Sequence, residues 1–484
     1  MTTSTLPLLP LLLADVPRSL VRALEHDGIP TERYNTAPFA GQFVLFDSRR
    51  RPCPTLVAGQ QAIDIRSLIE SPSDDPWTAL DDLGSQRTSW HLGELTVQET
   101  IARVDKRQVR RVALIQLQQA IEQRGGVWLQ LAPVPWPYRT VFNLRADHDS
   151  YVAEDFDRFL TAISGHESSV SHFICAGGFD NHREVLDRLQ EHDVGSHGFW
   201  HHTYTDADSN RRNIMRGIDA LQAAGIDPRG FVAPHGRSNP ALRGVLDELG
   251  VSHGGEFSLA WDDWPWFADS SRVLQIPVHP ICLGIALEAI EKQRPGDDLA
   301  RDRAAALIAE HFERYILAQH AAAEPIMLYG HPDARLGRYP AVVHQLLQVV
   351  DSLPDVWQTT QTNLARWWRL RHSIRLSVQR SADSLIVEML DDPQGFTPAV
   401  DIWCDGRVAR LKVDGARTVI EPQRLPYEQR LAPFRLDSLP VDEPVSLRDR
   451  FKHWLDWEKA TPVNEIRARS MRGWLKRGLR GMTR

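Results

Sequence analysis

Short apolar runs alternate with helical patterns through the centre of the chain. Between residues 138 and 371 the runs have the length of buried strands, and the segments between them carry apolar residues at helical spacing. One helix is expected over Ser209–Ala224, with Asp208 or Ser209 as its N-cap and Gly225 as its stop. Repeated β/α units of this kind predict an α/β fold, either a parallel β/α barrel or a doubly wound sheet. The expected strands are Val141–Leu144, Ser171–Ile174, Val194–His197, Phe231–Ala233, Leu274–Pro277, Pro325–Tyr329 and Trp357–Thr359.

Residues 1–135 predict a smaller α/β unit. Helical spacing appears at Ser19–His26 and Val97–Gln123, and the apolar run Phe43–Phe46 suits a strand. The apolar stretch Leu6–Leu13 has no Lys or Arg before it and contains two prolines. We therefore expect a buried strand or turn there rather than a signal peptide.

The pattern changes after residue 371. Over residues 372–440 apolar and polar residues alternate with period two, which predicts a small antiparallel β-domain. Residues 441–484 form the last segment, in which Val463–Arg484 carries seven Lys or Arg against one Glu, with apolar residues near helical spacing. This predicts a basic amphipathic helical tail, for which peripheral contact with the inner membrane surface competes with docking on an acidic partner and with disorder.

Composition and charge narrow the class of protein. A formal charge of -7 argues against general nucleic-acid binding, since phosphate contacts need a basic surface. No apolar run reaches the length of a membrane span. The four cysteines lie far apart and show neither a metal-binding spacing nor a disulfide framework. Together these features predict a cytoplasmic protein.

Two acidic residues follow the first strand of the central unit. Asp147 and Asp149 flank His148, shortly after Val141–Leu144. A carboxylate at a strand end is costly to bury without a partner. A functional role for the pair therefore competes with an ordinary turn or helix N-cap.

Histidines crowd the end of a later strand. His197 and His201 are four residues apart, which in a helical turn places both imidazoles on one face; His202 replaces His201 if the turn is not helical. Two imidazoles and one carboxylate make an open, three-ligand zinc site. Surface or core histidines are the alternative to such a metal site.

In order and spacing, these motifs resemble the first two motifs of the polysaccharide deacetylase superfamily, the NodB-homology or family 4 carbohydrate esterase domains. The resemblance covers roughly residues 140–360 and implies a distorted parallel β/α barrel of about seven strands. It also implies that Asp147 is the general base and that Asp149, His197 and His201 hold a divalent metal, with Zn²⁺ expected. One residue separates the two aspartates here, whereas the commonest family motif has them adjacent.

The third family motif, Arg-x-Pro-aromatic-Gly, resembles Val232–Gly236. Val232 stands in place of the arginine that steadies the catalytic aspartate, so Arg145 and Arg237 are candidates for that role by nearness in sequence. His235 stands at the aromatic position, where the resemblance implies a backbone N–H directed at the oxyanion. A turn after a strand is the alternative interpretation.

Two further segments resemble the fourth and fifth motifs. Asp262, Asp263 and Trp264 lie in a tryptophan-rich segment, where the family lines its sugar groove and orients a histidine; dense tryptophans also occur in ordinary cores. His331 ends a buried apolar strand at the position of the family's general acid. Asp262 or Asp263 is expected to pair with His331 and keep it charged.

The resemblance implies metal-dependent removal of an acyl group from the nitrogen of an amino sugar, in a polysaccharide or a lipid-linked glycan. Asp147 would take a proton from water, His235 would help to hold the oxyanion, and His331 would protonate the amine. This chemistry needs neither a nucleotide nor a redox cofactor. The main alternative, favoured by Val232, is a non-catalytic glycan-binding or scaffold barrel in envelope polysaccharide assembly. A hydrolase of another non-peptide C–N bond is the second alternative.

Overall fold

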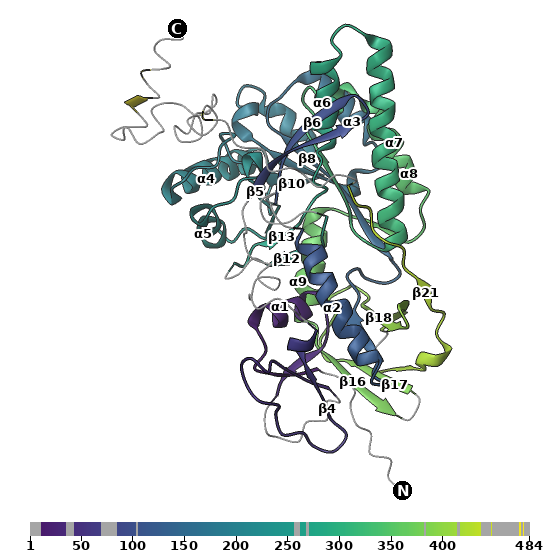
Figure 1. Ribbon diagram of the computed structural model, residues 1–484. Helices are drawn as coiled ribbons and strands as arrows, with labels where there is room; N and C mark the ends of the chain where they lie inside the picture. The colour runs from purple at the N-terminus through teal and green to yellow at the C-terminus, as the bar shows by residue number, and fades with distance from the viewer. Residues whose placement is uncertain are drawn as a thin grey trace.

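The computed structural model describes most of the chain. In Figure 1 residues 11–34 and 43–64 and the hairpin of residues 376–381 and 384–389 lie together at one end, and the central segment forms the larger body, with residues 85–102 packed beside it. The basic tail predicted over residues 441–484 falls outside the described residues, apart from isolated positions. The described residues are 11–34, 43–68, 85–102, 105–255, 262–267, 271–381, 384–413 and 417–436, with Leu447, Trp474, Leu475 and Gly478.

A series of parallel pairings builds the central part. Its strands are β8 (Thr140–His148), β9 (Val170–Ile174), β10 (Asp193–Ser196), β11 (His253–Gly254), β13 (Leu274–Gln275), β14 (Ile326–Gly330) and β15 (Val356–Gln358). β10, β9, β8 and β14 form one sheet in that order, and β15 pairs with the beginning of β8. Single parallel bridges join Ser196 to Phe231 and Gly230 to His253, and β11 pairs with β13.

The series of pairings begins at β14, runs through β8, β9, β10, β11 and β13, and closes again on β14. After β13, the N–H of His279 donates to the carbonyl of Met327 in β14 at 2.8 Å. The strand expected at Phe231–Ala233 contributes only a bridge, and the one expected at Leu274–Pro277 is shorter. The α/β class with parallel strands is confirmed. The pairings form two sheets joined by single bridges, with β12 (Trp266–Phe267) antiparallel at the edge of the second.

Helices cover the strands of the central part. One apolar cluster joins β8 and β14 to four of these helices. The helix expected from Ser209 begins slightly earlier, because the side chain of Asp206 accepts the Ser209 N–H at 2.9 Å and caps it. Within the described residues, no helix is long and apolar enough to cross a membrane. The helices are α3 (Ala153–Ala162), α4 (Ala207–Ala223), α5 (Pro240–Glu248), α6 (Leu283–Gln293), α7 (Asp298–Ala322), α8 (Pro340–Asp351) and α9 (Gln361–Ser373).

The N-terminal segment forms a parallel sheet accompanied by two helices. Its strand order is β2-β1-β3-β4, and every pairing is parallel. The helix expected at Ser19–His26 is confirmed as α1. The helix expected at Val97–Gln123 is wrong in its first part, because residues 95–102 bury alternate side chains and pair as a strand. The elements are β1 (Leu11–Ala14), α1 (Arg18–His26), β2 (Thr31–Arg33), β3 (Phe43–Phe46), β4 (Gln61–Asp64), β5 (Ser85–Leu92), β6 (Leu95–Ala102), α2 (Lys106–Glu122) and β7 (Trp128–Leu131).

Antiparallel sheets follow the central part. β18 pairs with β7, so the segments expected as separate units, residues 1–135 and 372–440, share a sheet and an apolar core. The domain boundaries themselves stay a prediction. The strands are β16 (Leu376–Ser381), β17 (Ser384–Met389), β18 (Ala399–Cys404), β19 (Arg407–Lys412), β20 (Thr418–Ile420) and β21 (Glu428–Gln429).

A buried arginine connects the central part to this shared core. Arg371, near the end of α9, donates to the carbonyls of His26 and Leu131 at 2.8 Å each and to that of Ala132 at 3.0 Å. Burial lowers the pKa of Arg371 to about 10. The three carbonyls belong to the end of α1 and to β7 and its exit, so one side chain satisfies backbone groups of two elements.

We expect the substitution Arg371→Met to lower the free energy of unfolding by about 3 kcal/mol, because it leaves three carbonyls without their donor. Urea denaturation followed by tryptophan fluorescence measures the change. Arg366→Met is the matched control: Arg366 is exposed on the same helix, with its guanidinium over the Phe396 ring, and its loss should cost less than about 1 kcal/mol. Equal losses in the two variants would contradict this role of Arg371.

Candidate metal and catalytic site

Alternation along β8 sets the positions of its charged residues. Side chains two residues apart leave a strand on the same face, so Arg145, Asp147 and Asp149 share one face although Asp149 lies just past the strand end. His148 points to the opposite face, where its ring packs edge-on against Phe159. Although His148 lies between them in the sequence, Asp147 and Asp149 therefore direct their side chains to the same face.

Two histidines lie close to one carboxylate oxygen of Asp149. Its Oδ1 lies 3.1 Å from His201 Nε2 and 3.4 Å from His197 Nε2. The ligand atoms of the three residues lie within 4.8 Å of one another. Burial alone would raise the pKa of Asp149, but the imidazoles of His331, His201 and His197 bring it well below its usual value. The sequence-predicted ligands are thus together, at the ends of β8 and β10.

The donor set and its surroundings fit a divalent cation. Oδ1 of Asp149 is buried and faces Nε2 of both His197 and His201, so one carboxylate oxygen and two imidazole nitrogens converge where a cation would sit. The carbonyl of Val232 lies 2.7 Å from His197 Nδ1 and can only accept, so Nδ1 carries the proton and Nε2 keeps its lone pair. A hydrogen bond from the other ring nitrogen to a backbone carbonyl is typical of metal-binding histidines. Asp149, His197 and His201 would hold the metal.

A loop, rather than a helical turn, carries the two histidines. None of residues 197–202 is helical, which corrects the expectation of a helical turn, but His201 and not His202 completes the group with Asp149. Asn213 of α4 fixes the loop: its side chain accepts the N–H groups of Phe199 and Trp200 at 3.0 and 2.7 Å. The same side chain donates to the carbonyls of Trp200 and His202 at 3.0 Å each.

Arg145 holds both oxygens of Asp147. Its Nε and Nη2 donate to the Asp147 carboxylate at 2.9 and 2.6 Å, and its Nη1 donates to the Gly255 carbonyl at 3.0 Å. Both side chains are buried. Of the two candidate arginines, Arg145 therefore makes the contact with the aspartate, whereas Arg237 is exposed.

His331 lies on the other side of Asp149. Its Nε2 is 3.7 Å from Asp149 Oδ2, and its Nδ1 is 3.6 Å from the sulfur of Cys282. Burial lowers the pKa of His331 to about 4. Arg335 also approaches Asp149 Oδ2, at 3.7 Å. The position of His331 at the end of β14 agrees with the sequence, but a thiol stands where a carboxylate was expected.

Asp262 and Asp263 do not pair with His331, which corrects the expectation. Asp262 lies 3.0 Å from Nδ1 of His279 and accepts the Tyr315 hydroxyl at 2.9 Å. Asp263 accepts two hydrogen bonds from Arg110 of α2, at 2.8 and 2.6 Å. Both carboxylates are buried and satisfied by these partners.

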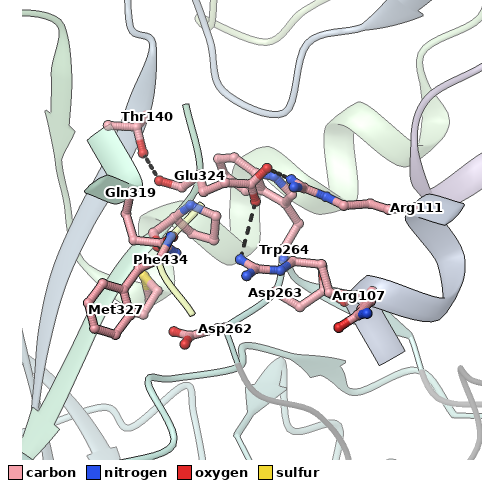
Figure 2. A network of polar contacts seen from close by, with 12 residues as sticks. Arg107, Arg111, Thr140, Asp262, Asp263, Trp264, Gln319, Glu324, Met327 and Phe434 are labelled. Atoms are coloured by element: carbon pink, nitrogen blue, oxygen red, sulfur yellow. Dashed lines mark hydrogen bonds and ion pairs between the residues drawn. The ribbon is translucent and has the colours of Figure 1, made fainter. Parts of the chain in front are cut away.

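The segment 262–264 lies near the strand starts, away from the metal group. The Asp262 N–H donates to Val278, and the adjacent His279 N–H donates to Met327. Four residues of β14, roughly 13 Å, separate Met327 from His331. Trp264 is also buried, with its ring 6.0 Å from that of Trp368. Figure 2 shows Asp262, Asp263 and Trp264 in a network of polar contacts with Arg107, Arg111 and Glu324.

His235 sits in a strained turn beside the group. Its φ of 59° is left-handed, a conformation that side chains with a Cβ adopt at a cost of order 1 kcal/mol or more. Its ring is exposed, and its centroid lies 4.6 Å from that of His201. The turn Pro234–Gly236 thus keeps His235 next to a candidate ligand. The role of its backbone N–H stays a prediction.

Sequence reasoning missed Asn213 and Cys282. Asparagine is unfavourable inside a helix, so an Asn on the buried face of α4 is a signal that its amide serves another segment. Cys282 gave no such signal, because a single buried cysteine is usually an ordinary apolar residue.

Comparison with known proteins bears on the same residues. A protein-family model described as polysaccharide deacetylase matches residues 147–254. No curated protein sequence matches the chain. Solved structures match about half of it. A Mycobacterium smegmatis protein named as a polysaccharide deacetylase is 20% identical, with 50% of this chain and 95% of that chain covered and a TM-score of 0.41. The PuuE allantoinase is 18% identical (48% and 92% covered, TM-score 0.38). A Bacillus anthracis family 4 carbohydrate esterase pseudoenzyme is 15% identical (49% and 70% covered, TM-score 0.32).

Replacing Asn213 by Ala should lower the free energy of unfolding by about 3 kcal/mol, because buried N–H and carbonyl groups of the histidine loop lose their partner. Thermal and urea denaturation measure the loss. Met215→Ala on the same helix is the control, since Met215 is exposed and should change stability by about 0.5 kcal/mol or less. A stable Asn213→Ala variant would show that the loop does not depend on this side chain.

Proposed function

We propose that this chain is a metal-dependent hydrolase that removes an N-acyl group, most simply acetyl, from an amino sugar of a polysaccharide or lipid-linked glycan. The match of residues 147–254 to the polysaccharide deacetylase model supports this proposal. The observation that carries the proposal is the convergence of Asp149, His197 and His201. Asp147 and His331, an acid–base pair that a binding module does not need, come from the ends of adjacent strands beside that group. The proposal treats the closed series of parallel pairings as a distorted β/α barrel.

The donor set favours zinc. One carboxylate oxygen and two imidazole nitrogens form a three-ligand set that leaves a position open for catalysis. When bound, a divalent cation supplies Lewis-acid polarisation of a carbonyl and a more acidic water. The remaining chemistry belongs to the side chains around it.

Asp147 is the proposed general base. Its carboxylate is fixed by two hydrogen bonds from Arg145, so its orientation is set before substrate arrives. The same two hydrogen bonds satisfy both oxygens of the buried carboxylate. Arg145 makes the contact with the aspartate that the resemblance assigns to an arginine at the position of Val232.

His331 is the proposed general acid. Burial keeps it neutral at rest, so the proton that it gives to the leaving amine must reach it during turnover. Asp147, on the neighbouring strand β8, takes a proton from the attacking water and is therefore the proposed source of the proton that reaches His331. The contact with Cys282 limits rotation of the His331 ring and directs Nε2 towards Asp149.

A glycan-binding or scaffold role is the second candidate. It is favoured by the environment of His331, whose Nδ1 faces a thiol rather than a carboxylate that would hold a proton on the ring. Hydrolysis of another non-peptide C–N bond would use the same metal group.

We place the reaction in the cytoplasm on a precursor or lipid-linked sugar; recovery of the protein in a secreted fraction would contradict that location.

The deciding experiment measures acetate release from N-acetylated oligosaccharides and lipid-linked sugars. The assay is run before chelation, after chelation and after zinc is restored. The proposal expects activity that is lost with the metal and regained with it. Metal-bound protein that turns over none of these substrates would contradict deacetylation and favour the scaffold role.

Variants should separate metal binding from proton transfer. His197→Ala and His201→Ala should each lose bound zinc, because each removes one of three ligands. Asp147→Asn should keep zinc and lose at least about 100-fold in kcat, because only the base is removed. Metal analysis and kinetics provide the readouts, with His182→Ala as a control at an exposed histidine. Full zinc occupancy in both ligand variants would overturn the assignment.

Arg145 should act as a positioning residue. Arg145→Met should keep zinc and lower kcat by about 10- to 100-fold with little change in KM, because Asp147 loses its orientation before the reaction step. Arg145→Lys should recover part of kcat, since one cationic donor remains. Arg237→Met, at the other candidate arginine, should stay within about twofold by the same reasoning. The reverse pattern would assign the role to Arg237.

A further inference from the structure

A second site-forming feature lies in the N-terminal sheet. Its strand order β2-β1-β3-β4 reverses direction between β1 and β3, because the chain passes from β1 to β2 on one side and then to β3 on the other. In open parallel sheets, ligands bind outside the carboxyl ends of the strands at such a switch point.

A cavity of about 990 Å³ occupies that position. Asp15 and Val16, which follow β1, line it together with Tyr34, which follows β2, and Arg50, which follows β3. The central part closes the other side through β12 and α9. Cavities that hold compact organic ligands have volumes of about 300–1,000 Å³, so this one is large enough for a nucleotide.

The charge of the lining is strongly positive. Among the described residues around the cavity, arginines exceed carboxylates, which are Asp15 and Glu25 only. Asp15 lies 3.5 Å from Arg50 Nε, and Glu25 is close to Arg22 and Arg18, so each carboxylate already has a cationic neighbour. The arginines are Arg18, Arg22, Arg33, Arg50, Arg272 and Arg369.

Such a concentration of cations is unexpected in a chain whose formal charge is -7. Guanidinium groups around one cavity repel one another, and an anion relieves that repulsion. Arginine is also the side chain best suited to bind phosphate through paired N–H groups. α1 begins at the same place without an acidic residue in its first turn, so its dipole adds to the positive potential.

The cavity also offers an aromatic surface. Phe267 is half-buried in its wall, with the Arg369 guanidinium 5.4 Å from its ring and the His372 ring at 5.4 Å. A ring-bearing ligand could therefore place its phosphate among the arginines and its planar part against Phe267.

We propose that this cavity binds an organic phosphate of nucleotide size. The site is distinct from the metal group: none of Asp147, Asp149, His197, His201 and His331 lines it. The inference does not rest on the proposed hydrolase, because it uses other residues and another type of ligand. The arginines replace the glycine-rich loop that nucleotide-binding sheets commonly use.

Isothermal titration of the full chain tests the proposal, with UDP, pyrophosphate and inorganic phosphate as probes at low and moderate salt. The double variant Arg33→Gln/Arg50→Gln removes two exposed arginines of the lining, and measuring its melting temperature checks that folding is kept. Arg66→Gln/Arg229→Gln makes the same change in charge at exposed positions away from the cavity.

The proposal expects UDP to bind more tightly than phosphate. It also expects at least a tenfold loss of UDP affinity in the cavity variant and less than a twofold change in the control. Equal losses in both variants would show only a general effect of charge and overturn the site. Failure of all three probes to bind, or equal affinity for phosphate and UDP, would overturn the ligand class. If the protein instead bound anionic phospholipid vesicles but not UDP, and the cavity variant lost that vesicle binding, the result would overturn the proposed organic phosphate in favour of a membrane surface.

Discussion

The side-chain alternation of one strand organises the candidate active site. Along β8, Arg145, Asp147 and Asp149 leave the backbone on the same face; β9 and β14 pair with β8 on either side, and β10 pairs with β9. A cation, a candidate base and a candidate metal ligand therefore come from five consecutive residues. The histidines that complete the group follow the ends of β10 and β14.

One departure from the motifs of the family that the chain resembles, Val232 in place of an arginine, has a local compensation in the structure. Arg145 supplies the contact with Asp147, and Val232 contributes its carbonyl to His197 instead of a side chain. His331 is different, since Cys282 faces its Nδ1. A thiol holds the ring but does not stabilise a proton on it as a carboxylate would. The unusual part of the site is therefore its proposed acid, not its proposed base or ligands.

Local patterns predicted the parts of the fold that depend on local forces. The strand ends that carry Asp147, His197 and His331 follow from short apolar runs, and α1 follows from its helical spacing. Contacts between residues that lie far apart in the sequence could not be predicted from local patterns. Asp263 is satisfied by Arg110, from α2 of the N-terminal segment, and this pairing follows from how the two parts pack. For the same reason, the sharing of one sheet by β7 and β18 was missed.

X-ray absorption at the zinc edge, on the full chain loaded with one equivalent of zinc, tests the central claim most directly. The account predicts only nitrogen and oxygen ligands at roughly 2.0–2.2 Å, with two imidazoles, and no sulfur at roughly 2.3 Å. A sulfur ligand would place the metal at a cysteine such as Cys282 and contradict the proposed centre. Well-folded protein that retains no zinc would contradict it as well.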